Sequence, residues 1–410
     1  MACPFVGYDI VCSEMRFFMK YDETILQTIP VGPLGLVPLR SSSEFGRLVD
    51  DQLKAWRNDR LTETPEVEAL PGYMLNSYIV DAVTPRFGSG EAKGVINESI
   101  RGKDLYFLVD ICNYSITYSL SGHVNHMSPD DHFQDLKRLI AASSGHARRI
   151  NVIMPFLYES RQHKRTCRES LDCAMALQEL VRMGVSNIIT FDAHDPRVQN
   201  SIPRTDFETV PCTYQFIKAL VRTVPDLVID KSQIMVISPD EGGMGRAVKL
   251  ANYLGVDMGM FYKRRDYTRI VNGKNPIIEH QFLGTDVAGK DVLIIDDMIS
   301  SGDSMIDVAK ELKSRKARRV FAFSTFGLFT NGLAKFDSAY DQGIIDNVFT
   351  TNLVYQTPEL LSRPYYVNVD LSKYVALIID SLNHNISLHE LLSPTNRINR
   401  LLAEHEKRIK

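Results

Sequence analysis

Short apolar runs alternate with amphipathic helical patterns along most of this chain, and no other feature restricts the fold as strongly. Runs such as 233–238 and 291–295 are apolar without a period of two, which is typical of strands covered on both faces. Because strands that alternate with helices are typical of parallel sheets, we predict an α/β fold. The expected strands are 34–39, 104–111, 151–154, 185–191, 233–238, 257–262, 291–295 and 319–325. The expected helices are 43–56, capped by Ser43, 171–183, ended by Gly184, 244–254 and 304–315.

The length and this rhythm together predict two domains. A chain of 410 residues is too long for one ordinary hydrophobic core, and the alternation restarts in the middle of the chain. We therefore expect an N-terminal extension (1–30), an N-terminal domain (31–205), a C-terminal domain (206–385) and a charged, solvated C-terminal helix (386–410). Three stretches do not fit the rhythm and are interpreted as insertions or mobile loops, namely 58–78, 113–131 and 268–284.

Composition narrows the class of protein. A net charge of -3 argues against a dedicated nucleic-acid-binding protein. No apolar run approaches the roughly 20 residues that span a bilayer, and residues 1–20 lack the pattern of a secretory signal. No C-x-x-C pair occurs, so we expect reduced thiols in a cytoplasmic enzyme. The six cysteines are Cys3, Cys12, Cys112, Cys167, Cys173 and Cys212.

The sharpest motif follows the predicted strand 291–295. Two carboxylates, Asp296 and Asp297, come at the end of this strand, and a short loop of small residues then leads into a helix. Small residues let backbone N–H groups approach a phosphate, the helix N-terminus favours the anion, and carboxylates accept hydrogen bonds from ribose hydroxyls. The motif therefore predicts a sugar-phosphate site, and the alternative is an ordinary strand–turn–helix corner with solvated aspartates. The loop residues are Ser300, Ser301, Gly302, Asp303 and Ser304.

This loop resembles the phosphoribosyl-pyrophosphate loop of type I phosphoribosyltransferases, and five further motifs narrow the resemblance. Together they resemble the ribose-phosphate pyrophosphokinases (phosphoribosyl-pyrophosphate synthetases), in that family's order and over roughly residues 33 to 380. The resemblance implies two tandem phosphoribosyltransferase-like domains, each a mainly parallel sheet flanked by helices. The five motifs are the flag region (86–104), the arginine–glutamine loop (155–162), a D-x-H segment (190–194), the segment 238–243 and the basic triplet 263–265.

Two of these motifs concern the nucleotide. Phe87 can stack on an adenine face, and Arg161 offers a planar fork to phosphates. Taken alone, the first is also consistent with a β-turn phenylalanine beside solvated charge, and the second with a solvated basic run. The resemblance assigns ATP binding to Phe87, Ser89, Gly90, Glu91, Arg161 and Gln162.

The remaining motifs concern metal and catalysis. A lone histidine is more often structural than a ligand, but the resemblance implies that His194 and Asp240 help to hold Mg²⁺, and His194 is also a candidate acid–base group. Lys263 and Arg265 lie, by strand alternation, on one side, and the resemblance makes them the main catalytic cations. Without it, the triplet could be a solvated strand edge. The long polar loop 266–284 is expected to close over the site.

The resemblance implies diphosphoryl transfer from ATP to ribose 5-phosphate, giving 5-phosphoribosyl 1-pyrophosphate and AMP for nucleotide biosynthesis. ATP and ribose 5-phosphate are then the small-molecule partners. Arg265, the two aspartates after the strand and the loop 300–304 are the expected ribose-5-phosphate residues. The resemblance also implies a homo-oligomer built on a dimer, with a hexamer as the family's larger assembly.

Three departures from the family's motifs affect this hypothesis. Ser89 stands where the flag usually has aspartate, and Ser300 and Asp303 stand where the phosphate loop usually has aspartate and glycine. Asp303 adds negative charge near a phosphate, which is unfavourable unless magnesium or a basic residue offsets it. The loop after Arg265 is longer than usual. The first alternative function is a catalytically weak regulatory homologue, and the second is a phosphoribosyltransferase that consumes the product.

Overall fold

The computed structural model describes residues 28–63, 65–265 and 277–409, and the chain forms two compact units. The first unit extends to Cys212 and also includes Asn352–Tyr355 and Asp370–Pro394. The second unit includes Thr213–Thr351, Gln356–Val369 and the chain from Thr395 onward. The predicted extension 1–30 lies outside the described residues except for its last three. The predicted boundaries treat the domains as consecutive, whereas the chain returns to the first unit after the second has begun.

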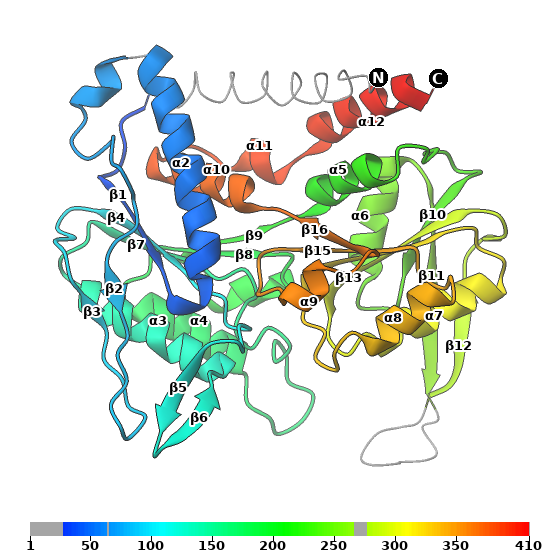
Figure 1. The fold of residues 1–410 in the computed structure, drawn as a ribbon, viewed down its shortest axis with the longest axis horizontal. Coiled ribbons are helices and arrows are strands. Elements are labelled where there is room, and N and C mark those ends of the chain that lie inside the picture. The colour runs from blue at the N-terminus through cyan, green and yellow to red at the C-terminus, as the bar shows by residue number, and fades with distance from the viewer. Residues whose placement is uncertain (1–27, 64, 266–276, 410) are drawn as a thin grey trace. The chain divides into compact units, whose positions relative to one another are not determined.

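The first unit is built on a five-stranded parallel sheet in the order β1-β4-β7-β8-β9. Four of these strands confirm predicted strands, and β9 was not predicted. Figure 1 shows α2 and α10 along one face of the sheet and α3 and α4 along the other. The elements are β1 Leu34–Pro38, β4 Asp104–Leu108, β7 Arg149–Ile153, β8 Asn187–Phe191, β9 Asp206–Val210, α2 Ser43–Glu63, α3 Pro129–Ser143, α4 Asp172–Arg182, α10 Ser372–Asn383 and α11 His389–Leu392. Two small hairpins accompany the sheet: β2 Ala82–Val83 with β3 Val95–Ile96, and β5 Thr117–Leu120 with β6 His123–His126.

The second unit is built on a seven-stranded sheet in the order β12-β11-β10-β13-β14-β15-β16. All neighbouring strands are parallel except β12, an antiparallel edge strand. Figure 1 shows α5 and α6 on one face and α7 and α8 on the other. The elements are β10 Ile234–Ser238, β11 Asp257–Arg265, β12 Ile277–Leu283, β13 Asp291–Ile299, β14 Val320–Gly327, β15 Asn347–Thr351, β16 Tyr366–Val369, α5 Thr213–Thr223, α6 Met244–Leu254, α7 Asp303–Ser314, α8 Ala334–Asp341, α9 Pro358–Leu361 and α12 Thr395–Ile409. The α/β class and the paired parallel sheets are therefore confirmed.

Three local predictions were wrong because tertiary contacts extend regular structure beyond the sequence signals. Helix α2 continues to Glu63 and begins at Ser43, which is therefore its first helical residue and not its cap. Strand β13 continues to Ile299, because Met298 and Ile299 still pair with β14. Part of the predicted loop 268–284 is strand β12, whose Phe282 ring packs 5.2 Å from that of Phe261.

Two further expectations also need correction. The stretch 113–131 contains the β5–β6 hairpin and the start of α3, where Ser128 and Asp131 form a capping box. The C-terminal helix is charged but not wholly solvated. Ile398 and Leu401 of α12 are buried, and His405 Nε2 lies 2.8 Å from the carbonyl oxygen of Leu227.

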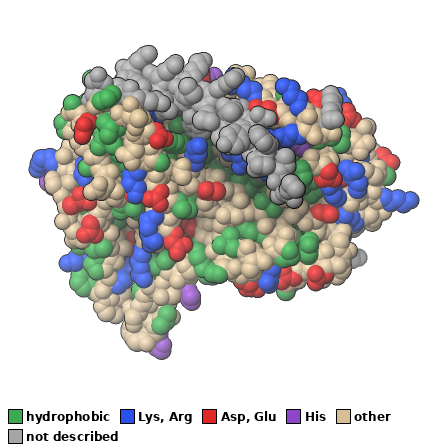
Figure 2. Space-filling model, turned by 45° about the horizontal axis from the view of Figure 1, so that its top comes forward, with side chains coloured by type: hydrophobic (Ala, Val, Ile, Leu, Met, Phe, Trp, Pro, Cys, Tyr) green, Lys and Arg blue, Asp and Glu red, His purple; other side chains and the backbone are tan. Residues whose placement is uncertain are grey.

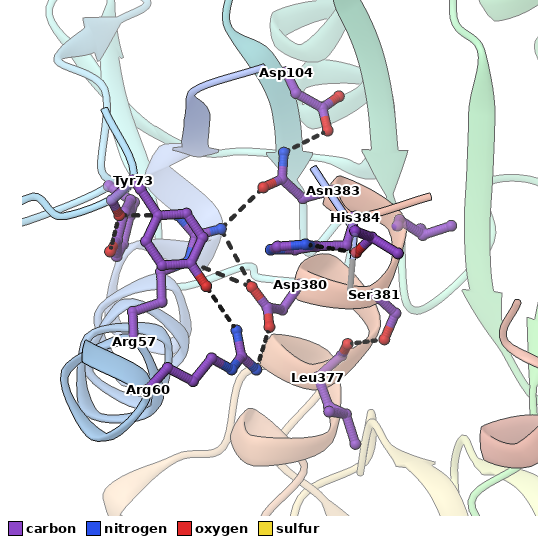
Figure 3. Close-up of polar contacts among 12 residues, drawn as sticks. Arg57, Arg60, Tyr73, Asp104, Leu377, Asp380, Ser381, Asn383 and His384 are labelled. Atoms are coloured by element: carbon purple, nitrogen blue, oxygen red, sulfur yellow. Dashed lines mark hydrogen bonds and ion pairs between the residues drawn. The ribbon is translucent and has the colours of Figure 1, made fainter. Parts of the chain in front are cut away.

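A buried ionic network joins α2 to α10 within the first unit (Figure 3). Asp380 of α10 pairs with Arg57 at 3.2 Å and with Arg60 at 2.6 Å, and all three side chains are almost fully buried. Arg57 also donates to Asn383 Oδ1 at 2.9 Å, and Asn383 Nδ2 donates to Asp104 Oδ2 at 3.0 Å. The network therefore connects the helix pair to the first residue of β4. It explains why α2 continues through a stretch that the sequence rhythm assigned to an insertion.

His384, next to this network, makes the first unit sensitive to acid. Burial lowers the pKa of His384 from 6.5 to about 4. The unfolded chain therefore binds a proton at this histidine below pH 6.5, whereas the folded chain binds it only below about pH 4. The free energy of unfolding consequently falls as the pH falls through this window. The contribution approaches about 3 kcal/mol at the acid end, from about 1.4 kcal/mol per pKa unit.

When the pH is lowered from 7 to 5, the free energy of unfolding of the parent chain should fall. In the His384→Gln variant this fall should be about 2 kcal/mol smaller than in the parent chain. Urea unfolding at the two pH values, followed by fluorescence of the single tryptophan, Trp56 in α2, measures this difference. The exposed His389 provides a matched control, because His389→Gln should keep the parent pH dependence. An unchanged pH dependence in His384→Gln would contradict the assignment.

The surface shown in Figure 2 carries acidic and basic side chains close together, with apolar side chains between them. Across the described part of the chain, no helix combines the length and apolarity needed to cross a membrane. The four cysteines whose state the structure describes are free thiols, namely Cys112, Cys167, Cys173 and Cys212.

Candidate active site

In the second unit, three neighbouring strands bring the predicted site segments to one edge of the sheet. Strands β11, β10 and β13 are adjacent and parallel, so their carboxyl ends lie side by side. The basic triplet ends β11, the segment 238–243 begins at the last residue of β10, and the aspartate pair lies near the end of β13, directly before the loop. Ligands of open α/β sheets bind at the carboxyl ends of the strands. The sequence could not specify this strand order.

The carboxylates at this edge are held close together. Burial and the neighbouring carboxylates of Asp297 and Asp240 raise the pKa of Asp296 from 3.8 to about 8. The Asp297 backbone N–H donates to Asp296 Oδ1 at 2.8 Å, and Asp297 Oδ2 lies 3.4 Å from an Arg246 nitrogen on α6. The two aspartates lie inside β13, not after it, and their carboxylates are close enough to interact with each other. Such a concentration of negative charge favours a bound cation or hydroxyl donors.

The loop that follows β13 is shaped by its glycine. Gly302 has a φ of +84°, which a residue with a side chain rarely adopts. A Cβ at this position would also collide with the ring of Phe336 on α8. Helix α7 begins directly afterwards at Asp303, so residues 300–304 lie at the N-terminus of a twelve-residue helix, as an anion-binding loop requires. Asp303 forms an ion pair with Lys335 of α8.

The segment after β10 forms a tight turn into α6. Ser238 Oγ donates to the Asp240 carbonyl oxygen at 2.7 Å, and the Gly243 N–H donates to Asp240 Oδ1 at 3.2 Å. A Cβ at Gly243 would lie 2.9 Å from Ser238 Oγ, so the turn needs glycine there. These bonds place the Asp240 carboxylate at the start of α6.

Lys263 and Arg265 belong to β11, and the structure describes their backbone only. Strand β11 pairs with β12, and the register shifts between Arg264 and Arg265. Arg264 pairs with Glu279 and Arg265 with Ile277, so the extra residue at this shift lies in β12 and not in β11. Their common orientation stays a prediction. The part of the expected closing loop between 266 and 276 lies outside the described residues.

In the first unit, the flag residues form one compact turn. The Phe87 N–H donates to the Glu91 carbonyl oxygen at 2.7 Å, and Gly90, at a φ of +90°, donates back to the Phe87 carbonyl oxygen at 2.9 Å. Ser89 Oγ donates to Glu91 Oε2 at 2.9 Å. The Phe87 side chain is 53% exposed and so is open to stacking on a ligand. Ser89, one of the departures from the family, thus orients the Glu91 carboxylate.

The hairpin β5–β6 supports this turn. The Arg86 guanidinium lies 4.8 Å from the centre of the Tyr118 ring and 2.9 Å from Asp135 Oδ2. A Cβ at Gly90 would lie 2.8 Å from Leu120. The stretch that did not fit the sequence rhythm therefore packs against the flag turn.

The arginine–glutamine loop and the D-x-H segment follow neighbouring parallel strands, β7 and β8. The ring of His163, next to Gln162, lies 5.4 Å from the ring of His194, and His163 Nε2 is 3.4 Å from Asp195 Oδ2. Gln162 Nε2 donates to the Ser170 carbonyl oxygen at 2.7 Å. The structure thus brings His194 close to the loop that contains Arg161 and Gln162. Through its hydrogen bond to Ser170, the Gln162 side chain also has a structural role. That Phe87 lies beside Arg161 stays a prediction.

Sequence reasoning missed Asp110, which follows β4 at the same sheet edge. It is fully buried, and burial raises its pKa to about 7. Its carboxylate accepts from the N–H groups of Cys112 at 2.8 Å and Tyr355 at 2.6 Å. An aspartate that directly follows an apolar strand was the available signal.

The described residues include no group of three or more His, Cys, Asp or Glu side chains arranged to hold a metal ion by themselves. Mg²⁺ commonly takes one or two carboxylates and completes its shell with water and substrate phosphates. Asp296, Asp297 and Asp240 lie close enough together for their carboxylates to interact, and carboxylate oxygens are ligands that Mg²⁺ takes. The residues present therefore fit Mg²⁺ bound together with phosphates.

Comparisons with known proteins agree with this arrangement. Residues 36–184 match the N-terminal domain of ribose phosphate pyrophosphokinase, and residues 211–356 match the phosphoribosyl transferase domain. A ribose-phosphate pyrophosphokinase of Mycoplasma pneumoniae is 30% identical over 307 residues, which are 74% of this chain and 84% of that protein. One of Vibrio cholerae is 28% identical over 319 residues, covering 76% and 91%.

The fold has a solved counterpart. The crystal structure of phosphoribosylpyrophosphate synthetase from Mycobacterium smegmatis matches with a TM-score of 0.66 at 20% identity, covering 86% of this chain and 99% of that chain. The same family is supported by both matched domains, by the two sheets and by the motifs at their carboxyl edges. The chain therefore belongs to the ribose-phosphate pyrophosphokinase family.

Proposed function

We propose that this chain transfers the diphosphoryl group of ATP to the anomeric hydroxyl of ribose 5-phosphate, giving 5-phosphoribosyl 1-pyrophosphate and AMP. The observation that carries the proposal is the strand order β11-β10-β13, which gathers the basic triplet, Asp240 and the aspartate–phosphate loop at one sheet edge. A phosphate loop alone would suit many sugar phosphates. The cations that end β11, which is separated from β13 by β10 alone, provide for a polyphosphate at the same sheet edge.

In this proposal the residues position and neutralise the reactants. The anomeric oxygen forms a bond to the β-phosphorus as the bond to the oxygen of the α-phosphate breaks, and AMP leaves. Residues 300–304 bind the 5-phosphate at the N-terminus of α7. Asp296 and Asp297 accept from the ribose hydroxyls, and Lys263 and Arg265 stabilise charge on the transferred group and on AMP.

On the nucleotide side, the exposed Phe87 stacks on adenine, and Ser89 and Gly90 keep Glu91 in reach of its exocyclic amine. Arg161 and Gln162 contact the nucleotide phosphates and ribose. His194 assists removal of the proton from the attacking hydroxyl. Mg²⁺, held by Asp240 and His194 together with phosphate oxygens, would supply charge neutralisation of the triphosphate.

The direct test incubates the purified chain with ATP, Mg²⁺ and ribose 5-phosphate. We expect AMP and 5-phosphoribosyl 1-pyrophosphate in equal amounts, measured by chromatography and ³¹P NMR. Reactions without ribose 5-phosphate serve as the control and should give neither product. Inorganic phosphate with ADP, without AMP, would instead indicate simple ATP hydrolysis and contradict the proposal.

Two other functions predict different results in the same reactions. A weak regulatory homologue would bind ATP, as seen by calorimetry, without forming AMP. A phosphoribosyltransferase would consume 5-phosphoribosyl 1-pyrophosphate and release pyrophosphate when given a base. The changed residue Asp303 in the phosphate loop favours the first of these alternatives, whereas the retained Lys263 and Arg265 argue against it.

We also propose that the chain works in the cytoplasm as a homo-oligomer built on dimers, with a hexamer as the larger assembly. The free thiols of the described cysteines support the reducing compartment. Light scattering of the purified chain at several concentrations would measure the assembly.

A further inference from the structure

The phosphate loop of this chain contains and follows carboxylates whose negative charge would oppose the binding of a phosphate. Asp303 is the first residue of α7, where the 5-phosphate would bind, and Asp296 and Asp297 lie in the preceding strand. Two unit charges 4 Å apart near a protein surface repel strongly, so an uncompensated Asp303 would oppose a phosphate dianion.

The segment from β14 to α8 lies along this loop and brings a lysine to it. The Thr330 N–H donates to the Ser300 carbonyl oxygen at 2.9 Å, and the Phe336 ring occupies the space beside Gly302. Lys335 precedes Phe336, and its Nζ donates to Asp303 Oδ1. The ammonium of Lys335 is the largest cause that lowers the pKa of Asp303. The backbone contacts therefore fix the segment that presents this lysine.

We propose that Lys335 enables this loop to bind ribose 5-phosphate by neutralising Asp303. This inference rests on the function proposed above, and it adds a positioning residue from a helix outside the loop motif. When Lys335 pairs with Asp303, the charge of the Asp303 carboxylate is neutralised. The loop at the N-terminus of α7 then presents its backbone N–H groups and hydroxyls to the phosphate without an opposing charge. Without it, the carboxylate competes with the phosphate for the same helix terminus.

A role in stability alone is a poor explanation of the pair. The Lys335 and Asp303 side chains are 55% and 49% exposed, and ion pairs of this exposure contribute little to folding. The pair is thus expected to matter for binding rather than for folding. Thermal midpoints of the variants below should stay within about 4 °C of the parent chain.

The test is a double-mutant cycle on ribose 5-phosphate. We expect Lys335→Met to raise the KM and the calorimetric Kd for ribose 5-phosphate about tenfold or more, with the KM for ATP nearly unchanged. Asp303→Asn alone should tighten ribose 5-phosphate binding, because the opposing carboxylate is removed while the ammonium of Lys335 remains. The double variant should return to within about threefold of the parent, because both charges are then absent.

Lys407→Met, an exposed lysine near the end of α12, is the matched control and should leave both constants unchanged. The proposal is overturned if Lys335→Met resembles this control, or if the double variant binds as poorly as Lys335→Met. Calorimetry with ribose 5-phosphate separates this inference from the proposed function. A parent chain that binds the sugar phosphate without forming AMP refutes diphosphoryl transfer, while the four-variant comparison still decides on Lys335.

Discussion

Lys263→Ala is expected to lower kcat by about a thousandfold or more while the chain stays folded. The sheet edge already holds Asp240, Asp296 and Asp297, and the proposed substrates add phosphate groups to it. A unit charge at about 4 Å is worth about 4 kcal/mol in a partly exposed site, which corresponds to about three orders of magnitude in rate. Lys263 is the cation that the family resemblance makes central to transfer.

The measurement is steady-state AMP formation, with circular dichroism to verify folding. Arg264→Ala is the matched control, because the neighbouring strand position is expected to face the other side of the sheet. We expect that variant to keep its activity within a few-fold of the parent. Near-normal turnover in Lys263→Ala would refute the catalytic role assigned to this lysine.

Asp380→Ala should have the largest effect on stability, lowering the free energy of unfolding of the first unit by about 3–5 kcal/mol. The substitution leaves the guanidinium groups of Arg57 and Arg60 buried without their carboxylate. The carboxylate holds its charge because these two arginines keep the pKa of Asp380 well below its usual value, despite burial. Removing one partner of a buried pair costs far more than the pair contributes.

Urea unfolding followed by Trp56 fluorescence measures this loss, since Trp56 in α2 lies beside Lys373 of α10. Asp59→Ala, at an exposed position of the same helix, should change stability by no more than about 0.5 kcal/mol. Replacing all three charges, as Arg57→Met, Arg60→Met and Asp380→Leu together, should recover most of the loss. A triple variant as unstable as Asp380→Ala would show that packing, and not unpaired charge, is responsible.

The elements best predicted from sequence are those with local signals. Helix α6 spans Met244–Leu254, as predicted, and Gly243 and Gly255 flank its amphipathic run in the structure. Most strands in the interiors of both sheets were recognisable as short apolar runs, but β15, between β14 and β16, was not predicted. Strand β13 was predicted too short because Asp296 and Asp297 resemble a loop, whereas the β14 partner strand extends the pairing past them.

What the sequence could not reveal depends on distant partners. Nothing near Asp303 indicates that Lys335 will neutralise it, since the two residues meet only when α8 packs beside α7. Likewise, the contact between the His163 and His194 rings requires β7 and β8 to be neighbours. The motifs predicted which residues gather at the sheet edges, but not the ion pairs and ring contacts that orient them.

The ionic link between α2 and α10 also has a consequence for the order of events during synthesis. Arg57 and Asp380 are separated by 323 positions. A ribosome-bound chain therefore completes the whole of the second sheet before the residue that neutralises the arginines of the first unit emerges. Until then, the nascent N-terminal unit carries two guanidinium groups that cannot be buried without a large cost. The native packing of α2 therefore waits until α10 has been synthesised.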